Sequence, residues 1–184
     1  MTRTDLYSDP LKDIMDIARQ FHEDPGAFIF AVLRIMIGLM LLWASFDKMF
    51  GLGYPTPHGM GYIDGGSPTE GFLQAASMGT FGWLFEPMMN IIPFTDVLVM
   101  ISMFGLGIGL TLGIGKKICC VGGMVMFFIF YLALCPISDN PVLDYHLIYI
   151  VILFGVLVTN SCKVLGLGKM WSDTELVKRF PILE

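Results

Sequence analysis

Charged side chains are scarce in this chain: Asp, Glu, Lys and Arg make up 15% of its 184 residues, and there are only three histidines. With no basic patch on a polar background, nothing supports nucleic-acid binding. The four cysteines contain no CxxC pair and form no disulfide framework, so a disulfide scaffold and a thioredoxin-like site are both excluded. Acidic residues scattered through positions 1–26 also interrupt any apolar core of a cleavable signal peptide.

Apolar residues are abundant instead. They make up 55% of the chain, above the roughly 45 to 50% of ordinary soluble domains. Spanning a bilayer takes on the order of 20 apolar residues in a helix, and stretches of about this length occupy residues 27–50, 94–115, 118–135 and 142–161. The sequence therefore predicts an all-α integral membrane protein, in which residues 27–165 form a bundle of four transmembrane helices.

The positions of Lys and Arg predict the orientation of these helices. Cations precede the first span, join the second to the third and follow the fourth, whereas the 51–93 loop and the 136–141 turn contain none. By the positive-inside rule, both termini are expected in the cytoplasm and the 51–93 loop outside the cell membrane. Within residues 1–26, positions 10–22 have the apolar periodicity of a helix lying on the cytoplasmic interface, and residues 166–184 form a cytoplasmic tail.

The long outer loop, residues 51–93, is expected to contain two short half-helices that cover the mouth of the bundle. Ser67-Pro-Thr-Glu70 has the pattern of a capping box, which predicts a helix starting at that point. A second apolar piece, residues 81–92, is interrupted by Pro87. Irregular backbone at this depth is tolerated where it is buried against protein or lines a cavity.

An arginine lies within the first span. Arg34 shares one helix face with Gly38, Leu41, Ser45 and Lys48, and this face is expected to point into the bundle. An ionisable group inside a membrane normally has a partner, which makes Arg34 a functional candidate. The alternative is that Arg34, two turns from the cytoplasmic end, extends its side chain to the interface.

Small and acidic residues mark the other spans. Gly105, Gly109 and Gly113 recur at every fourth position of the second span, a spacing that favours close packing of two helices. Asp96 lies in the expected first turn of that span, where a carboxylate complements the helix dipole. The fourth span is expected to begin with Asn140 as N-cap and Asp144 in its first turn.

Polar residues of several kinds gather at the outer ends of the spans, which is typical of a small-molecule pocket. A quinone needs a flat apolar slot, donors for its two carbonyl oxygens and a nearby proton carrier. Asp96, Asp144 and His146 are the candidate catalytic residues, and Tyr149 is a candidate binding residue. On an ideal helix Asp144 and His146 are about 200° apart, so both cannot face one slot directly.

Metal or haem chemistry is not expected. A haem held by two histidines needs facing imidazoles inside the bundle, and His146 is the only histidine in an expected span. A metal held by His58 and His146 requires the outer loop to fold back. The remaining candidates for substrate or quinone binding are Arg34, Asp47, Lys48 and Ser67.

Three segments resemble the DoxX/DoxD family of four-helix membrane proteins, and the DoxD branch most of all. They are Arg34 to Gly53, Gly65 to Leu73 and Asp139 to His146, and the resemblance covers about residues 27–165. It implies a quinone-linked redox role, because DoxD is the membrane subunit of an enzyme that oxidises thiosulfate to tetrathionate and reduces a membrane quinone. That enzyme also has a DoxA subunit. No segment of this chain looks like DoxA, so the activity implies a second polypeptide.

The resemblance leads to a mechanistic hypothesis. A small anion binds near Ser67 or Lys48, where backbone amides and positive charge favour it. The quinone enters between helices, Asp96, Asp144 and His146 handle protons, and Arg34 fixes a headgroup or a carboxylate. The alternative is a non-catalytic subunit of a larger membrane complex, whose outer polar residues serve for docking or capping. A small transporter is less favoured, since the spans show no internal repeat or paired broken helices.

Overall fold

The computed structural model describes residues 10–137 and 142–183, and within these ranges every regular element is a helix. The longer ones are α1 (Pro10–Glu23), α2 (Pro25–Phe50), α3 (Glu70–Ser77), α4 (Gly82–Met89), α5 (Ile92–Leu112), α6 (Lys116–Ala133) and α7 (Tyr145–Val158). The short ones are η1 (Tyr62–Asp64), α8 (Gly168–Ser172), α9 (Glu175–Arg179) and η2 (Pro181–Leu183). The expected all-α class is confirmed for this part of the chain.

Among the described residues, α2, α5 and α6 are long and apolar enough to cross a membrane. The fourth expected span, 142–161, is a shorter apolar helix, α7, of 14 residues. Fourteen residues rise about 21 Å, less than the roughly 30 Å of a bilayer core. The expected N-cap Asn140 lies outside the described residues, and α7 is capped by Asp144 instead.

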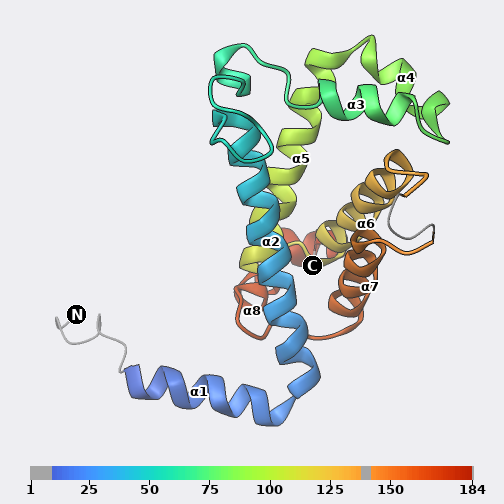
Figure 1. The fold of residues 1–184 in the computed structure, drawn as a ribbon. Helices are drawn as coiled ribbons and strands as arrows, with labels where there is room; N and C mark the ends of the chain where they lie inside the picture. Colours follow the sequence, from blue (N-terminus) through green and yellow to red (C-terminus); the bar gives the residue numbers. More distant parts are fainter. Residues whose placement is uncertain (1–9, 138–141, 184) are drawn as a thin grey trace.

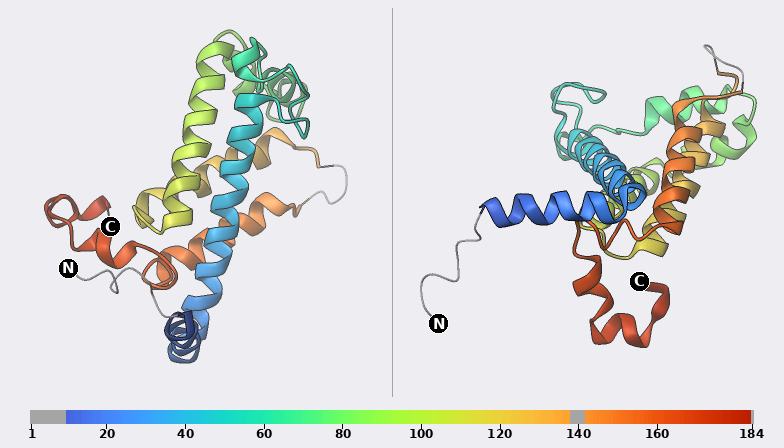
Figure 2. Two further views of the ribbon diagram at one scale, coloured as in Figure 1. Left: turned by 90° about the vertical axis from the view of Figure 1, so that its left-hand side faces the viewer. Right: turned by 90° about the horizontal axis from the view of Figure 1, so that it is seen from below.

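The long helices form two pairs (Figure 1). Helices α2 and α5 lie side by side, and α6 and α7 form a second pair that is strongly inclined to the first (Figure 2, left). We call the end that carries residues 51–91 the outer end, and the end that carries α1 and the 113–116 turn the inner end. Helix α1 projects away from α2 at the inner end, as a helix lying on an interface would.

The close approach of α2 and α5 depends on two glycines. A Cβ at Gly38 would lie 2.6 Å from the backbone nitrogen of Thr111, and one at Gly107 would lie 3.0 Å from the carbonyl oxygen of Gly38. The close packing predicted at Gly105, Gly109 and Gly113 is confirmed only in part. A Cβ at Gly105 would meet no atom within 4 Å, while Gly109 faces Cys119 of α6 and Gly113 faces Arg34.

We expect Gly38→Ala to lower the free energy of unfolding by about 1 to 3 kcal/mol, because overpacking a tight contact pushes backbones apart. Gly105→Ala is the matched control, since its new methyl group enters open space and its effect should stay within about 1 kcal/mol. Both values are measured by unfolding in detergent. Equal effects of the two substitutions would contradict the close crossing.

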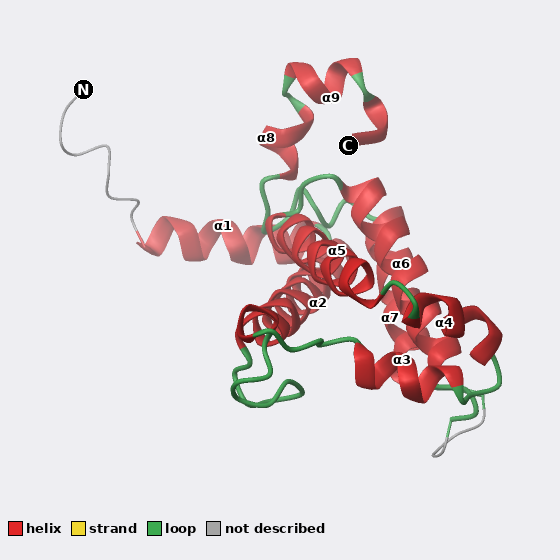
Figure 3. Cartoon of the chain, turned by 90° about the horizontal axis from the view of Figure 1, so that it is seen from above, coloured by secondary structure: helices red, strands yellow, loops and turns green. Residues whose placement is uncertain are grey.

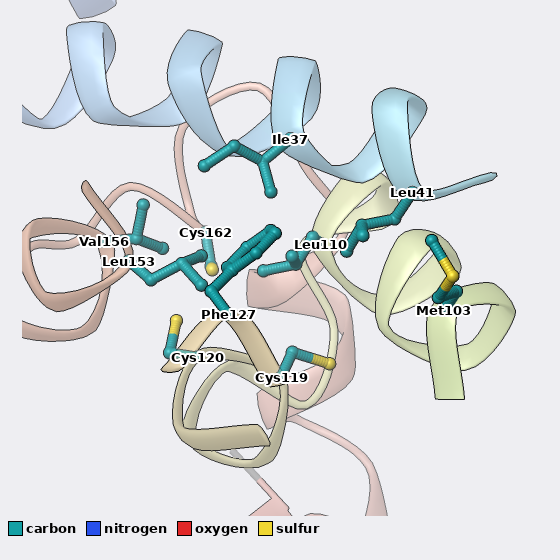
Figure 4. Packing of buried hydrophobic residues seen from close by; sticks show 10 residues of the cluster. All are labelled: Ile37, Leu41, Met103, Leu110, Cys119, Cys120, Phe127, Leu153, Val156 and Cys162. Carbon is teal, nitrogen blue, oxygen red and sulfur yellow. The ribbon is translucent and has the colours of Figure 1, made fainter. Parts of the chain in front are cut away.

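The main core lies where the two helix pairs meet towards the inner end. Figure 4 shows ten of its residues, with the ring of Phe127 between side chains of α2, α5 and α7. Three of the four cysteines, Cys119, Cys120 and Cys162, are buried here as free thiols. This cluster ties α6 and α7 to α2 at one end of the helices.

Helices α3 and α4 lie over the outer end of α6 and α7, beside the loop that covers α2 (Figure 3). A second small core of Leu73, Ala76, Phe85 and Ala133 holds them there. The two expected half-helices are thus confirmed, but their bounds differ from the prediction. Helix α3 begins at Glu70 without a side-chain cap, and Pro87 lies inside α4 rather than breaking it.

Candidate functional site

A cleft of about 1140 Å³ lies between α5 and α6 and is covered at the outer end by residues 55–60 and 67–73. Its surface is mostly apolar. On the α5 side it includes Leu98, Val99, Ile101, Ser102, Met103, Gly105 and Leu106, and on the α6 side Ile118, Cys119, Gly122, Val125, Met126, Ile129, Phe130 and Leu134. The cleft therefore follows α6 along most of its length.

Most polar groups of the cleft lie towards the outer end. Of the residues singled out in the sequence, Lys48, Ser67 and His146 line it, and Tyr145 joins them. The Lys48 side chain is half-buried, and no carboxylate forms an ion pair with it among the described residues. The result is a long apolar slot with a cation, a hydroxyl, a phenol and an imidazole near one end.

His146 is held by Asp144. The Asp144 carboxylate lies 2.5 Å from His146 Nδ1 and also accepts the backbone N–H groups of His146 and Leu147. Both side chains are buried, with 8% and 6% of their surface exposed. This carboxylate fixes Nδ1 as the donor, which leaves Nε2 of the neutral ring as an acceptor.

As expected, His146 lines the cleft and Asp144 is not among the lining residues, but the geometry behind that expectation is wrong. The expectation assumed that both residues were inside one ideal helix. Asp144 is the N-cap of α7, with the extended backbone angles φ −132° and ψ 176°. Its side chain therefore folds back over the first turn, where it reaches the ring of His146.

Aromatic rings surround His146. The ring centroid of Tyr145 lies 4.2 Å away, and those of Phe130 and Phe127 lie 5.9 and 6.1 Å away. Tyr149 packs on Phe127 with centroids 5.0 Å apart, but it is not among the residues that line the cleft. Of these rings, Phe130 and Tyr145 also line the cleft, so its outer end is aromatic beside the imidazole.

Asp96 anchors the outer loop to α5. Its Oδ2 accepts the Ser67 hydroxyl at 2.8 Å, and its Oδ1 accepts the hydroxyl and backbone N–H of Thr69 at 2.6 and 2.9 Å. The side chain is 2% exposed. The predicted capping roles of Asp96 and Ser67 are thus wrong, because α5 begins at Ile92 and the two side chains bond to each other.

Asp47 has a similar role at the end of α2. Its carboxylate is fully buried and accepts the backbone N–H groups of Thr56 at 2.8 Å and Tyr54 at 3.4 Å. Gly51 ends α2 with a left-handed conformation, φ 59°, so the chain turns back over the helix end. Asp47 therefore shapes the loop beside Lys48 without lining the cleft.

Arg34 lies near the inner end, away from the polar end of the cleft. The side chain is completely buried, and its guanidinium donates to the carbonyl oxygens of Leu110, Thr111 and Leu165. The predicted inward face is confirmed for Arg34, Gly38, Leu41 and Ser45, all of which are buried. Among the described residues, Arg34 does not pair with a carboxylate: its guanidinium bonds to two carbonyl oxygens in the last turn of α5 and to that of Leu165, after α7.

Two residues of the site were not among the candidate site residues chosen from the sequence. Thr69 supplies two of the three hydrogen bonds to Asp96, and Tyr145 lines the cleft beside His146. The Ser-Pro-Thr string could have indicated Thr69, since the hydroxyl groups of Ser67 and Thr69 lie two residues apart in one loop. Tyr145 belongs to the polar residues expected at the outer ends of the spans, but its place beside His146 depends on where α7 begins.

Among the described residues, no group of three or more His, Cys, Asp or Glu side chains is placed to hold a metal ion. His58 bonds through Nδ1 to the carbonyl oxygen of Gly51 at 2.9 Å, within the loop that covers α2.

Comparisons with protein-family models, with curated proteins and with solved structures gave no match. The membrane character of the chain consequently rests on its three long apolar helices.

Proposed function

We propose that this chain is a DoxX/DoxD-type protein of the cell membrane, in which α2, α5, α6 and α7 make up a four-helix membrane domain with both termini in the cytoplasm. The distribution of Lys and Arg supports this topology. The position of α1 and the Lys116-Lys117 turn at the inner end, opposite α3 and α4, is compatible with it (Figure 1). In this arrangement the exposed apolar faces of these helices contact the lipid bilayer.

The function that this geometry supports best is quinone-linked redox chemistry. The observation that carries the proposal is the cleft between α5 and α6, whose apolar walls end at the buried His146–Asp144 pair. A membrane quinone is a flat polar ring on a long apolar tail. The ring would lie near His146, Tyr145 and Lys48, and the tail would follow α6 towards Ile118 and Cys119.

His146 and Asp144 have the arrangement needed to move a proton. Reduction of a quinone takes two electrons and two protons, and oxidation of two thiosulfate ions to one tetrathionate releases two electrons. His146 would transfer one proton through Nε2, while Asp144 stabilises the charged imidazolium and holds its orientation. Asp96 would act indirectly, by holding Ser67 and Thr69 at the covering of the cleft. Lys48 would attract the oxygen of the quinone or a small anion.

A partner polypeptide is part of this proposal. It would be a DoxA-like subunit or a larger membrane complex, because the resemblance covers the DoxD part alone. A non-catalytic accessory role is the second candidate. It is favoured by the structural engagement of Arg34, Asp47 and Asp96, three candidate site residues whose described polar contacts all go to this chain's own loops and helix ends.

The test is thiosulfate-dependent reduction of a short-chain quinone by the complex purified with its natural partner. We expect His146→Gln to lower kcat roughly 100-fold, within the range for loss of a general acid or base, with quinone affinity changed less than threefold. His22→Gln is the matched control, because His22 lies exposed in α1, and it should leave kcat within twofold.

Three results would contradict the proposal in distinguishable ways. Unchanged turnover in His146→Gln would remove the proton role of this residue. Quinone binding without thiosulfate oxidation would exclude thiosulfate as the donor. Absence of both binding and turnover would favour the accessory role.

A further inference from the structure

A second, smaller hollow lies at the inner end, where α5, α6 and the segment after α7 meet. It has a volume of about 20 Å³ and is lined by Gly113, Lys116, Asn160, Cys162, Lys163, Gly168 and Trp171. Asn160 and Lys163 are exposed, so the hollow opens to the surface. A space of this size holds about one water-sized group, such as one oxygen of a larger anion whose remainder lies outside.

The hollow is positively charged. Two of its lining residues are lysines and none of those described is acidic. Lys116 is half-buried and its Nζ donates to the carbonyl oxygen of Thr159 at 3.4 Å, which directs the ammonium group across to the segment after α7. Burial raises the pKa of the Cys162 thiol against the opposing effects of Arg34 and Lys116, so this residue adds no negative charge.

The helix ends around the hollow add to this charge. The 18-residue helix α6 begins at Lys116, and its N-cap, Gly115, provides no side-chain cap, so the positive end of its dipole is left uncapped. The negative end of α5 is neutralised nearby. Arg34 donates to Leu110 and Thr111, and the N–H of Leu167 donates to the carbonyl oxygen of Leu112 at 2.7 Å.

We propose that this hollow binds the phosphate group of an anionic phospholipid. A lipid is favoured over free phosphate because the hollow lies at the ends of the membrane-length helices α5 and α6. Trp171 lines it, and the exposed side chains of Ile118, Leu167 and Met170 lie close to it in the sequence and offer contacts for acyl chains. Basic pockets between membrane helices are recognised binding places for acidic headgroups.

Native mass spectrometry of the full chain in a neutral detergent tests this. The probes are phosphatidylglycerol and phosphatidylcholine with identical acyl chains. We expect the wild type to bind one phosphatidylglycerol at least fivefold more tightly than phosphatidylcholine. In Lys116→Gln/Lys163→Gln this preference should fall below twofold.

Lys169→Gln/Lys178→Gln is the matched control, because it removes the same charge outside the hollow and should keep the preference. Lys163→Gln alone changes an exposed side chain and should weaken phosphatidylglycerol binding at least twofold without altering the thermal midpoint. No preference in the wild type, no weakening in Lys163→Gln, or an equal loss in the control pair, would overturn the proposal.

Inorganic phosphate at 10 mM, against chloride of equal ionic strength, separates the two sources of the ligand. Retention of bound phosphatidylglycerol in phosphate supports the lipid. Its displacement, together with binding of phosphate alone that is lost in Lys116→Gln/Lys163→Gln, would overturn the lipid assignment and make free phosphate the ligand of the hollow.

Discussion

Replacing Arg34 with Ala is expected to lower the free energy of unfolding by about 3 to 5 kcal/mol, because three carbonyl groups lose their donor, a fully buried guanidinium, at once. The guanidinium lies between two glycines: a Cβ at Gly113 would lie 2.8 Å from Nη1 and one at Gly166 would lie 2.9 Å from Nη2. Removing it therefore leaves a cavity as well as unpaired acceptors.

The measurement is the thermal midpoint and the unfolding free energy in detergent, with Arg19→Ala as the control. Arg19 is 66% exposed in an ion pair with Glu23, and its loss should change stability by less than about 1 kcal/mol. The loss of stability in Arg34→Lys should lie between those of Arg34→Ala and Arg19→Ala, since an ammonium group can still donate to one or two of the carbonyls. A stable Arg34→Ala protein would show that these hydrogen bonds do not hold the inner end of α5.

Replacing Asp96 with Ala is expected to destabilise the outer end by about 3 kcal/mol or more. The carboxylate accepts three hydrogen bonds from Ser67 and Thr69, and bonds to charged groups contribute about 1.5 to 3 kcal/mol each, with incomplete additivity. Asp96→Asn should give a smaller loss, because the amide keeps one acceptor and places a donor opposite the hydroxyls. In Asp96→Ala, residues 51–69 should become much more sensitive to proteolysis than in the wild type.

Asp64→Asn is the control for Asp96. Asp64 is exposed in the same loop, so its substitution should leave both stability and proteolysis unchanged. The two roles considered for Asp96 predict different outcomes. If Asp96 anchors the loop, both Asp96→Ala and Asp96→Asn should make the loop more sensitive to proteolysis. If the Asp96→Asn protein is instead stable and protease-resistant but no longer reduces quinone, Asp96 is a catalytic residue.

Helices with a strong periodic or apolar pattern were predictable from the sequence. The 10–22 pattern corresponds to α1, and three of the four apolar stretches correspond to α2, α5 and α6 within a few residues. The prediction that the helix face carrying Arg34 is buried was also correct. These features depend on local patterns, which the sequence contains directly.

The errors arose where a distant partner competed with a local signal. Ser67 fits a capping box, but its hydroxyl bonds to Asp96, 29 residues away. Asp144 was assigned to the first turn of a helix and is its N-cap, and this difference brings it to His146. The inclination of α6 and α7 to the other pair, which accompanies the cleft, is likewise a tertiary property that no single helix pattern encodes (Figure 2).

Photolabelling with an azido-substituted quinone tests the central claim most directly, because it reports where the ligand lies. With the azide on the quinone ring, we predict that the label concentrates near His146, Tyr145 and Lys48, and that unlabelled quinone competes for it. Gly122→Trp should fill the cleft and reduce labelling at least tenfold, whereas Val121→Trp, on the exposed face of α6, should not. Labelling spread evenly over the exposed faces of α2 and α6, or unchanged by Gly122→Trp, would contradict a quinone site in this cleft.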